Sequence, residues 1–384
     1  MRRGQMGRIC LLLALFLGAG LVFCLPAFAE EGGVTLPEGF SDAAEALPNE
    51  SLSTLPDGFF SSDPAAAGEA VEKTVSVEYL MDTVLSLIGL ELSGAVKLLA
   101  VLCGLLILSA VFGSAQKSLS SDRLSTAFGF CSTAAIFSAI ATLQFRQMES
   151  VELFFERLSG LMGSMIPVLG SLWAMGGNVA TASAGTGTLY VFLTVCQRIC
   201  SVTVLPVCGV CTVLALCNAL SPEVGARGIT GALKKIYTFT LGTIMTLLLT
   251  SLSAQTTLTA AADSTTARAA KLAASTAIPI VGGSVGETLR TLSSGVQYMK
   301  GIVGVGGIVL LLLLVLPVLI SLILARLSFL LAVGVAELLG CDREARLLSE
   351  LGSVWGTMIA VVAMSSVMFI LALCLFIKTV VAVG

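Results

Sequence analysis

The stretch Ile166-Pro167-Val168-Leu169-Gly170 returns 112 residues later as Ile278-Pro279-Ile280-Val281-Gly282. Two further pairs repeat in the same order and at nearly the same offset: Leu205-Pro206-Val207 with Leu316-Pro317-Val318, and Gly242-Thr243 with Gly356-Thr357. These anchors indicate an internal repeat of about 112 residues, and the apolar stretches between them are long enough to cross a bilayer. Repeated membrane helices are typical of transporters and channel subunits. Chance matching in apolar sequence of low diversity is the alternative.

The composition identifies an integral membrane protein. Of the 384 residues, 56% are hydrophobic and only 12% are charged, whereas a soluble domain carries about 25% charged residues. The formal net charge of −3 and the absence of a basic cluster argue against nucleic acid as a partner.

Several classes of active site are excluded by residue type. The sequence contains no histidine, so it lacks Ser-His-Asp and Cys-His nucleophiles and imidazole metal sites. The carboxylates form no defensible metal site or acid–base pair. We therefore expect no catalytic residue, no metal and no cofactor, and hence no enzyme.

The eleven cysteines lie almost entirely in apolar runs, where cysteine behaves as a small buried hydrophobe. Cys208 and Cys211 have the spacing of a redox pair, but no βαβ pattern flanks them. Helix packing is the preferred interpretation of this pair.

The N-terminus has the pattern of a secretory signal peptide. Arg2, Arg3 and Arg8 flank an apolar run over residues 9–25, and Ala27-Phe28-Ala29 follows as a cleavage site. Residues 1–29 are therefore predicted to be a signal peptide that leaves the mature N-terminus extracytoplasmic. An uncleaved membrane anchor is the alternative.

Residues 30–76 are acidic and rich in Pro, Gly, Ser and Ala. Such a segment has little apolar surface to offset the entropy of ordering, so we predict an exported, disordered segment. It contains an echo, Leu36-Pro-Glu-Gly-Phe40 and Leu55-Pro-Asp-Gly-Phe59. The echo is either a pair of docking motifs for an extracytoplasmic partner or drift in a sequence of low complexity.

The fold predicted for the rest is an all-α polytopic membrane protein with about six transmembrane helices plus re-entrant or interfacial helices. Residues 77–160 are expected to form an interfacial helix, two transmembrane helices and a helix along the bilayer surface over residues 148–162. Membrane repeat 1 is assigned to residues 161–272 and membrane repeat 2 to residues 273–384. The expected spans are residues 96–115, 124–143, 189–216, 236–253, 302–324 and 351–377.

The two Ile-Pro-x-x-Gly segments are the candidate pore or hinge elements. The residues concerned are Pro167, Gly170, Pro279, Gly282 and Gly283. Short apolar stretches broken by proline and glycine are typical of half-helices, which are tolerated at membrane depth only beside protein or a wet cavity. A hinge that merely lets helices pack is the alternative. If the segments do not cross the membrane the repeats are parallel, which we favour; if they cross, the repeats are inverted.

Few polar residues interrupt the spans. Arg198 is either buried with a partner among Asn218, Glu223 and Glu337, or interfacial and snorkelling to the surface. Arg326, at the end of its span, is a similar case. Gly352 and Gly356 form a Gly-x-x-x-Gly pair that permits close approach of two helices.

The order of these features is similar to that of a known family. The run Ile278-Pro-Ile-Val-Gly-Gly283, Lys300-Gly-Ile-Val-Gly304 and Leu316-Pro317 resembles the stage III sporulation protein AE family of endospore-forming bacteria. The likeness covers most of the chain and is best over residues 275–376, although the acidic segment has no counterpart.

The resemblance implies a permease-like, non-enzymatic subunit of the channel that joins mother cell and forespore, in the outer forespore membrane. Its implied partners are the other stage III A operon proteins, including an ATPase and ring-forming subunits, and the forespore protein Q. An autonomous small-solute transporter and a membrane scaffold for the exported segment are the alternatives. A transporter should carry ionisable residues within its spans for coupling, and this chain has almost none beyond Arg198.

Overall fold

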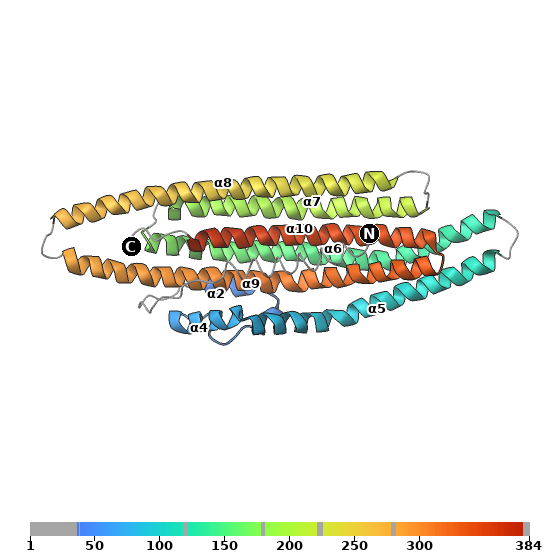
Figure 1. Cartoon of the computed structure of the whole chain (residues 1–384), viewed down its shortest axis with the longest axis horizontal. Helices are drawn as coiled ribbons and strands as arrows, with labels where there is room; N and C mark the ends of the chain where they lie inside the picture. The colour runs from blue at the N-terminus through green and yellow to red at the C-terminus, as the bar shows by residue number, and fades with distance from the viewer. Residues whose placement is uncertain are drawn as a thin grey trace.

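The computed structural model describes residues 37, 39–117, 122–177, 181–220, 226–277 and 282–378, and within these ranges the secondary structure is helical, without a strand. Six long helices run up and down along one axis (Figure 1): α5 (Val77–Lys117), α6 (Asp122–Met175), α7 (Thr186–Leu220), α8 (Ala226–Ala277), α9 (Gly282–Leu338) and α10 (Asp342–Lys378). Among the described residues, six helices are long and apolar enough to cross a membrane. The predicted all-α polytopic fold is therefore confirmed.

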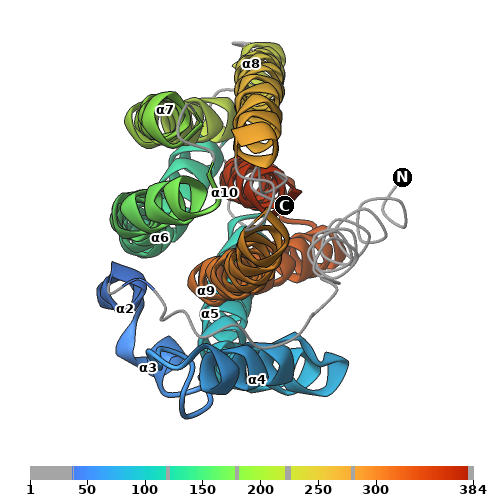
Figure 2. The same cartoon turned by 90° about the vertical axis from the view of Figure 1, so that its left-hand side faces the viewer.

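The bundle is organised around the hairpin of α9 and α10. Figure 2 shows α10 at the centre, with α7 and α8 on one side and α9 on the other. Leu351, Val354 and Trp355 of α10 are fully buried, as are Leu310 and Leu311 of α9. The leucine-rich run of α9 thus fills the core.

A glycine makes the tight turn between α9 and α10 possible. Gly340 has a φ of +72°, which is a left-handed conformation that costs other residues energy. The amide of Cys341 donates to the carbonyl of Ala336 over 2.9 Å and so closes the end of α9. The short connection forces α9 and α10 to lie side by side and antiparallel.

The outer helices present apolar side chains outward. Along α5 these include Leu90, Val96 and Phe112, and along α8 they include Phe239 and Leu247. In water such patches would be a liability, whereas in a bilayer they are the expected lipid-facing surface. The candidate spans of α5 and α8 are also the least buried of the six.

The prediction of a disordered acidic segment is wrong for residues 39–75. These residues form α2 (Gly39–Asp42), the 3-10 helix η1 (Ala43–Ala46), α3 (Asn49–Leu52) and α4 (Pro64–Val75), which we call the strap. The strap lies against α6 and α9. The strap has few apolar residues, but they lie together against α6 and α9. Composition alone does not predict this contact.

The predicted surface helix and re-entrant segment are also wrong, because both are parts of one continuous helix. α6 is 54 residues long and contains Pro167 in its interior. The apolar stripe that includes Val151, Phe155 and Leu158 is buried in the bundle, not laid on a bilayer. Pro167 is exposed and so breaks no internal packing. The predicted interfacial helix likewise continues into α5 without interruption.

The predicted repeat stays a prediction. Pro206 lies in α7 and Pro317 in α9, while Gly242 lies in α8 and Gly356 in α10. These two pairs of anchors thus fall in helices that run in the same direction (Figure 1), as parallel repeats require, whereas Ile278 to Val281 of the first pair lie outside the described residues. The assigned boundaries at residues 161 and 273 nevertheless fall inside α6 and α8 and separate no compact units.

Candidate functional site

A buried ion pair joins α8 to α10 inside the bundle. The Nζ atom of Lys234 lies 3.7 Å from Oε2 of Glu350 and donates to Oγ of Ser353 over 2.9 Å. It also donates to the backbone carbonyl of Glu350 over 3.4 Å. Buried ionisable groups at membrane depth are rare and are usually paired, so this ammonium has the partners that its burial requires.

A second polar contact joins α8 to α7 near the ion pair. The hydroxyls of Thr203 in α7 and Tyr237 in α8 lie 2.8 Å apart, and Tyr237 is one turn from Lys234. Three helices are therefore held at one level by polar groups in apolar surroundings. Such groups fix the register of helices more strictly than apolar contacts do.

Sequence reasoning missed Lys234 and Glu350, although a signal was present. Each precedes one of the predicted apolar runs, at Ile236 and Leu351 respectively. Since α8 and α10 run in the same direction, the beginnings of these two runs lie at the same level.

The predicted close approach at Gly352 and Gly356 occurs between α10 and α9. A methyl group at Gly356 would lie 2.9 Å from Cζ of Arg326, and one at Gly352 would lie 3.4 Å from Cβ of Phe329. Gly356 therefore makes room for the half-buried guanidinium of Arg326. This is a packing role, and it places Arg326 against α10 rather than at a free span end.

Trp355, next to Gly356, ties α10 to α6. Its Nε1 donates to Oε1 of Gln144, and both side chains are buried. No partner for Nε2 of Gln144 lies within hydrogen-bonding distance among the described residues. The same region packs the Trp355 ring against Phe329, with 5.4 Å between centroids.

At the turn between α9 and α10, polar groups reach α5. Oγ of Ser109 donates to Oε1 of Glu344 over 2.8 Å, and Oγ of Ser328 donates to the carbonyl of Ala95 over 3.0 Å. Burial raises the pKa of the Cys341 thiol, and the carboxylate of Glu344 raises it further. The thiol therefore stays protonated at neutral pH and has the character of a packing residue.

The two phenylalanines of the Leu-Pro-x-Gly-Phe echo pack together on α9. The ring centroids of Phe40 and Phe59 are 6.0 Å apart. A methyl group at Gly306 would lie 2.8 Å from Cζ of Phe40 and 3.5 Å from Cζ of Phe59. In this structure the echoed motifs dock onto the chain's own helix, so their place is explained without a partner protein.

The strap also replaces a backbone hydrogen bond that α9 lacks. Pro317 lies inside this helix, and because proline has no N–H, the carbonyl four residues earlier loses its helical donor. That carbonyl belongs to Leu313, and Oγ of Ser51 in α3 donates to it over 3.2 Å. The strap therefore supplies a donor to a buried backbone carbonyl, which would otherwise lack a hydrogen bond at a high cost in free energy.

Replacing Ser51 with alanine is expected to lower the free energy of unfolding by about 1–3 kcal/mol, because the Leu313 carbonyl loses its donor. The exposed Ser62 provides the matched control, Ser62→Ala, for which no change is expected. In the Pro317→Ala background the backbone N–H returns, so Ser51→Ala should cost measurably less. Chemical denaturation in mixed micelles checks this double-mutant cycle, and an equal cost in both backgrounds would contradict the assignment.

The predicted pore residues are not brought together in one lining. Pro167 and Gly170 lie within α6, where a methyl group at Gly170 would lie 2.6 Å from Cγ2 of Thr186 in α7. Gly282 and Gly283 begin α9, and Pro279 lies outside the described residues. The role shown for Gly170 is close packing of α6 on α7.

The predicted buried polar group does not assemble either. The side chain of Arg198 is exposed on α7, and Glu337 is exposed at the end of α9. Asn218 is buried, but it lies twenty residues from Arg198 in the same helix, which is about 30 Å along the axis. Glu223 lies outside the described residues. The predicted internal pairing of Arg198 with Asn218 is therefore not seen, and the side chain of Arg198 lies beside Gln197, whose Nε2 donates to the carbonyl of Phe155 in α6 over 3.2 Å.

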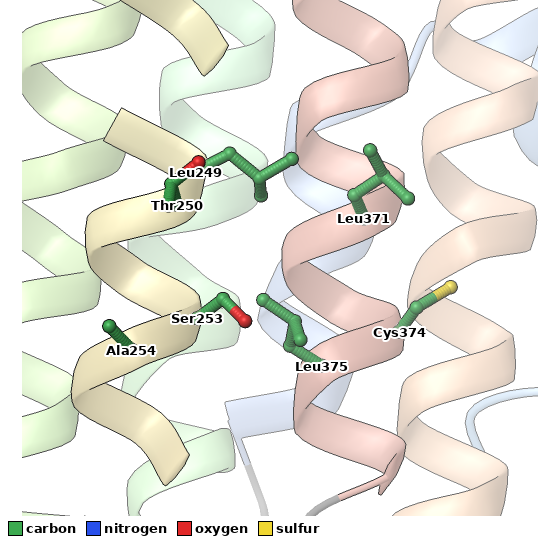
Figure 3. A pocket seen from close by; sticks show the side chains of 7 residues that line it. All are labelled: Leu249, Thr250, Ser253, Ala254, Leu371, Cys374 and Leu375. Atoms are coloured by element: carbon green, nitrogen blue, oxygen red, sulfur yellow. The ribbon is translucent and has the colours of Figure 1, made fainter. Parts of the chain in front are cut away.

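A groove opens between α8 and α10 (Figure 3). Leu249 and Ser253 point from α8 toward Leu375 of α10, and the groove has a volume of ≈ 480 Å³. Its lining consists of Leu249, Thr250, Ser253, Ala254, Leu371, Cys374 and Leu375. With aliphatic side chains and two hydroxyls, the lining offers no charge to a solute.

The described residues show no arrangement suited to metal or redox chemistry. Within their ranges, no group of three or more Cys, Asp or Glu side chains could hold a metal ion. Cys208 and Cys211 are both buried and unoxidised. The polar contacts described above join one helix to another.

The comparison with protein families gives a match over most of the chain. The model of the family described as stage III sporulation protein AE matches residues 67–380 of the 384. No curated protein and no solved structure matches the chain. The matched region includes α5 to α10. It therefore contains the buried ion pair and the close approach of α9 and α10 at Gly352 and Gly356. Because the match covers more than half of its length, the chain belongs to the stage III sporulation protein AE family.

Proposed function

We propose that this protein is a non-enzymatic, multipass subunit of a sporulation complex that links mother cell and forespore. The family membership supports a role in sporulation. The observation that supports a role as one subunit of a complex is the filled centre of the bundle. α10 lies on the bundle axis, and its residues Val354, Trp355 and Val361 are fully buried against neighbouring helices.

A filled centre favours a route between chains over a route through one chain. Protein interiors are packed to the density of organic crystals, so the α9–α10 core leaves no room for a solute without a large rearrangement. The strap and the polar seams between α6, α8, α9 and α10 resist such a rearrangement. Partners are therefore needed to complete a path, and the stage III A proteins and protein Q are the proposed ones.

The autonomous transporter is the weaker alternative. Coupled transport needs ionisable groups that exchange with water or ions. Lys234 is already paired with Glu350, and the lining of the α8–α10 groove contains no charged residue. The scaffold alternative, in which the spans only anchor a free exported segment, is disfavoured because the strap is packed on α6 and α9.

The test uses the tagged full chain in sporulating cells. After mild detergent extraction, the chain is expected to retain the ATPase and the ring-forming proteins, and its loss should abolish a late forespore reporter. Full reporter activity in cells that lack those partners but contain this chain would overturn the proposal. So would isolation of the chain alone from cells that make every partner.

A variant with neutralised strap carboxylates distinguishes the scaffold from the subunit. Asp42, Glu45, Asp57 and Asp63 are exposed on the strap, so neutralising them to Asn or Gln changes the exported surface but not the packing. A subunit of a channel body should keep its partners in this variant. A scaffold that binds through the strap should lose them.

A further inference from the structure

The outward face of α6 is charged in a stretch between two apolar parts of its 43-residue segment Thr133–Met175, which carries one of the candidate spans. Residues 146–157 of α6 include four exposed charged side chains: Arg146, Glu149, Glu152 and Glu156. The opposite side of the same turns is buried in the bundle, at Val151, Phe155 and Leu158. At the centre of a bilayer, each charge facing lipid would cost about 2.5–3.5 kcal/mol on insertion scales. This face therefore requires water.

Side-chain contacts fix the level of this charged stretch along the bundle. At the start of the stretch, Nε2 of Gln147 donates to Oγ of Ser321 in α9 over 3.4 Å. Eight residues beyond its end, Cε of Met165 lies 2.6 Å from where a methyl group at Gly307 would be. The charged stretch is thus level with part of residues 307–321 of α9, a run without any charged residue in the most apolar of the candidate spans.

The middle of α8 lies at the same level on another side of the bundle. Sδ of Met364 in α10 lies 3.7 Å from the position of a methyl group at Gly242. Met364 is nine residues before Leu373, whose Cδ1 lies 3.5 Å from the position of a methyl group at Gly307. Since α9 and α10 are antiparallel, nine residues lead from Gly307 to about residue 316. Gly242 is therefore level with the charged stretch of α6.

The surface of α8 at this level is uncharged and combines apolar side chains with threonines, such as Thr243 and Thr246, whose hydroxyls donate to the helix's own carbonyls. Phe239 is 74% exposed and Leu247 is 65% exposed. No charged residue occurs from Ile236 to Gln255. These are the properties of a lipid-facing helix, at the depth at which α6 presents carboxylates.

The strap extends the charged face rather than covering it. Gly39 approaches Val168 and Ala46 approaches Gly160, so the strap begins on α6 just beyond the charged stretch. Its outward side chains include the exposed carboxylates of Asp42, Glu45, Asp57 and Asp63. We call the exposed charged side chains of residues 146–157 of α6, together with the exposed carboxylates of the strap, the wet face.

We infer that the wet face lines an aqueous route at the depth at which α8 contacts lipid. The inference rests on the proposed function, because water at that depth must be walled off from lipid by neighbouring subunits of the same assembly. It moves the route from the proline–glycine segments, where the sequence placed it, to an outer surface of the bundle. The wet face is one wall of the route, and the filled α9–α10 core is its support.

A bilayer placed at another level of the bundle would leave both the α6 stretch and the middle of α8 in water. The apolar runs of α5 and of the first part of α6 extend beyond the end of α9, and Ala95 of α5 is already level with Ser328. If the bilayer surrounded that tip instead, both the α6 stretch and Gly242 would lie outside the membrane. Water would then reach both surfaces.

The test compares Glu152→Cys on α6 with Thr243→Cys on α8, two exposed positions at nearly the same level. Both are made in the full chain with the exposed Cys131 and Cys217 changed to serine, and that parent gives the background. Membranes from sporulating cells are opened by freezing and thawing and treated with a water-soluble methanethiosulfonate. In parallel, a lipid-dissolved carbene precursor is photolysed and its labelled peptides are mapped.

The expected result is modification of Glu152→Cys by the aqueous reagent, protection of Thr243→Cys, and carbene labelling of α8 but not of residues 146–157. Modification of both positions would overturn the inference, because this level would then lie outside the bilayer. Protection of Glu152→Cys, or carbene labelling of residues 146–157, would also overturn it. Ser150→Cys, on the same exposed face, serves if Glu152→Cys does not accumulate.

The outcome is separable from that of the proposed function. Each variant is also scored for partner retention and for the late forespore reporter. A fully active variant that is protected at both positions would remove the wet face and leave the subunit role intact. Loss of partners in the parent chain would instead count against the proposed function.

Discussion

Replacing Lys234 with leucine is expected to lower the free energy of unfolding by about 3–5 kcal/mol, because the carboxylate of Glu350 would remain buried without its cation. The side chains of Lys234 and Glu350 are only 10% and 15% exposed. Ser353 would lose its donor as well. The measurement is denaturant or SDS titration of the purified chain in mixed micelles, followed by tryptophan fluorescence.

Two controls make this prediction specific. The neighbouring Lys235 is exposed, so Lys235→Leu should change the stability little. In the double variant Lys234→Leu with Glu350→Leu, both charges are removed, and most of the lost stability should return. If the double variant were as unstable as the sum of the single variants, the ion pair would not be the cause. The buried pair would then matter only through its volume.

Replacing Trp355 with alanine is expected to cost about 3–5 kcal/mol through the cavity left in the core. Trp355 is fully buried at the centre of the bundle, and it contacts the ring of Phe329. The same change removes the donor to Gln144, whose amide is also buried. Because α10 is the central helix, the loss should also reduce the amount of chain that reaches the membrane.

The packing and hydrogen-bonding parts of that cost can be separated. Trp355→Phe keeps most of the buried ring and removes only the indole N–H, so it should cost about 1–3 kcal/mol, the range for an unsatisfied buried group. Adding Gln144→Leu removes the stranded amide, so Trp355→Phe should cost less in that background. Circular dichroism is the suitable probe, since these variants lack one of the two tryptophans. Equal costs for alanine and phenylalanine would argue against a cavity effect.

The membrane class and the number of spans could be predicted because they depend on local properties. Six apolar stretches of sufficient length are visible in the sequence, and each lies in one of the long helices. The close approach at Gly352 and Gly356 was predictable for the same reason, since only small residues let two helix backbones come close. Its partners, Arg326 and Phe329, were not predictable.

The continuity of the helices was not predictable from the proline and glycine positions. Pro167 and Gly170 look like a break, yet α6 passes through both. A proline removes one helical hydrogen bond, and the buried residues around it, such as Met165 and Leu169, keep the helix in place. Whether a proline ends a helix is therefore decided by the packing on its other faces.

The strap shows the limit of composition most clearly. Counted by residue type, the segment is acidic and poor in apolar side chains, and this composition predicts disorder. In the structure Phe40 and Phe59 meet on Gly306, and Ser51 reaches the carbonyl of Leu313 that Pro317 leaves without a donor. None of these partners is near the strap in sequence, so no local rule could connect them.

By itself, the sequence determined that the chain is helical, that it has the composition of a membrane protein, that it holds six stretches long and apolar enough to cross, and that it lacks histidine. These properties follow from hydrophobicity and residue type, which act over a single turn or a single span. The tertiary structure alone decided which charges are buried in pairs, which helix occupies the centre, and which surface is charged at the level of an apolar one. Those properties depend on side chains that are hundreds of residues apart and meet only after the helices have packed, as Ser51 and Leu313 do.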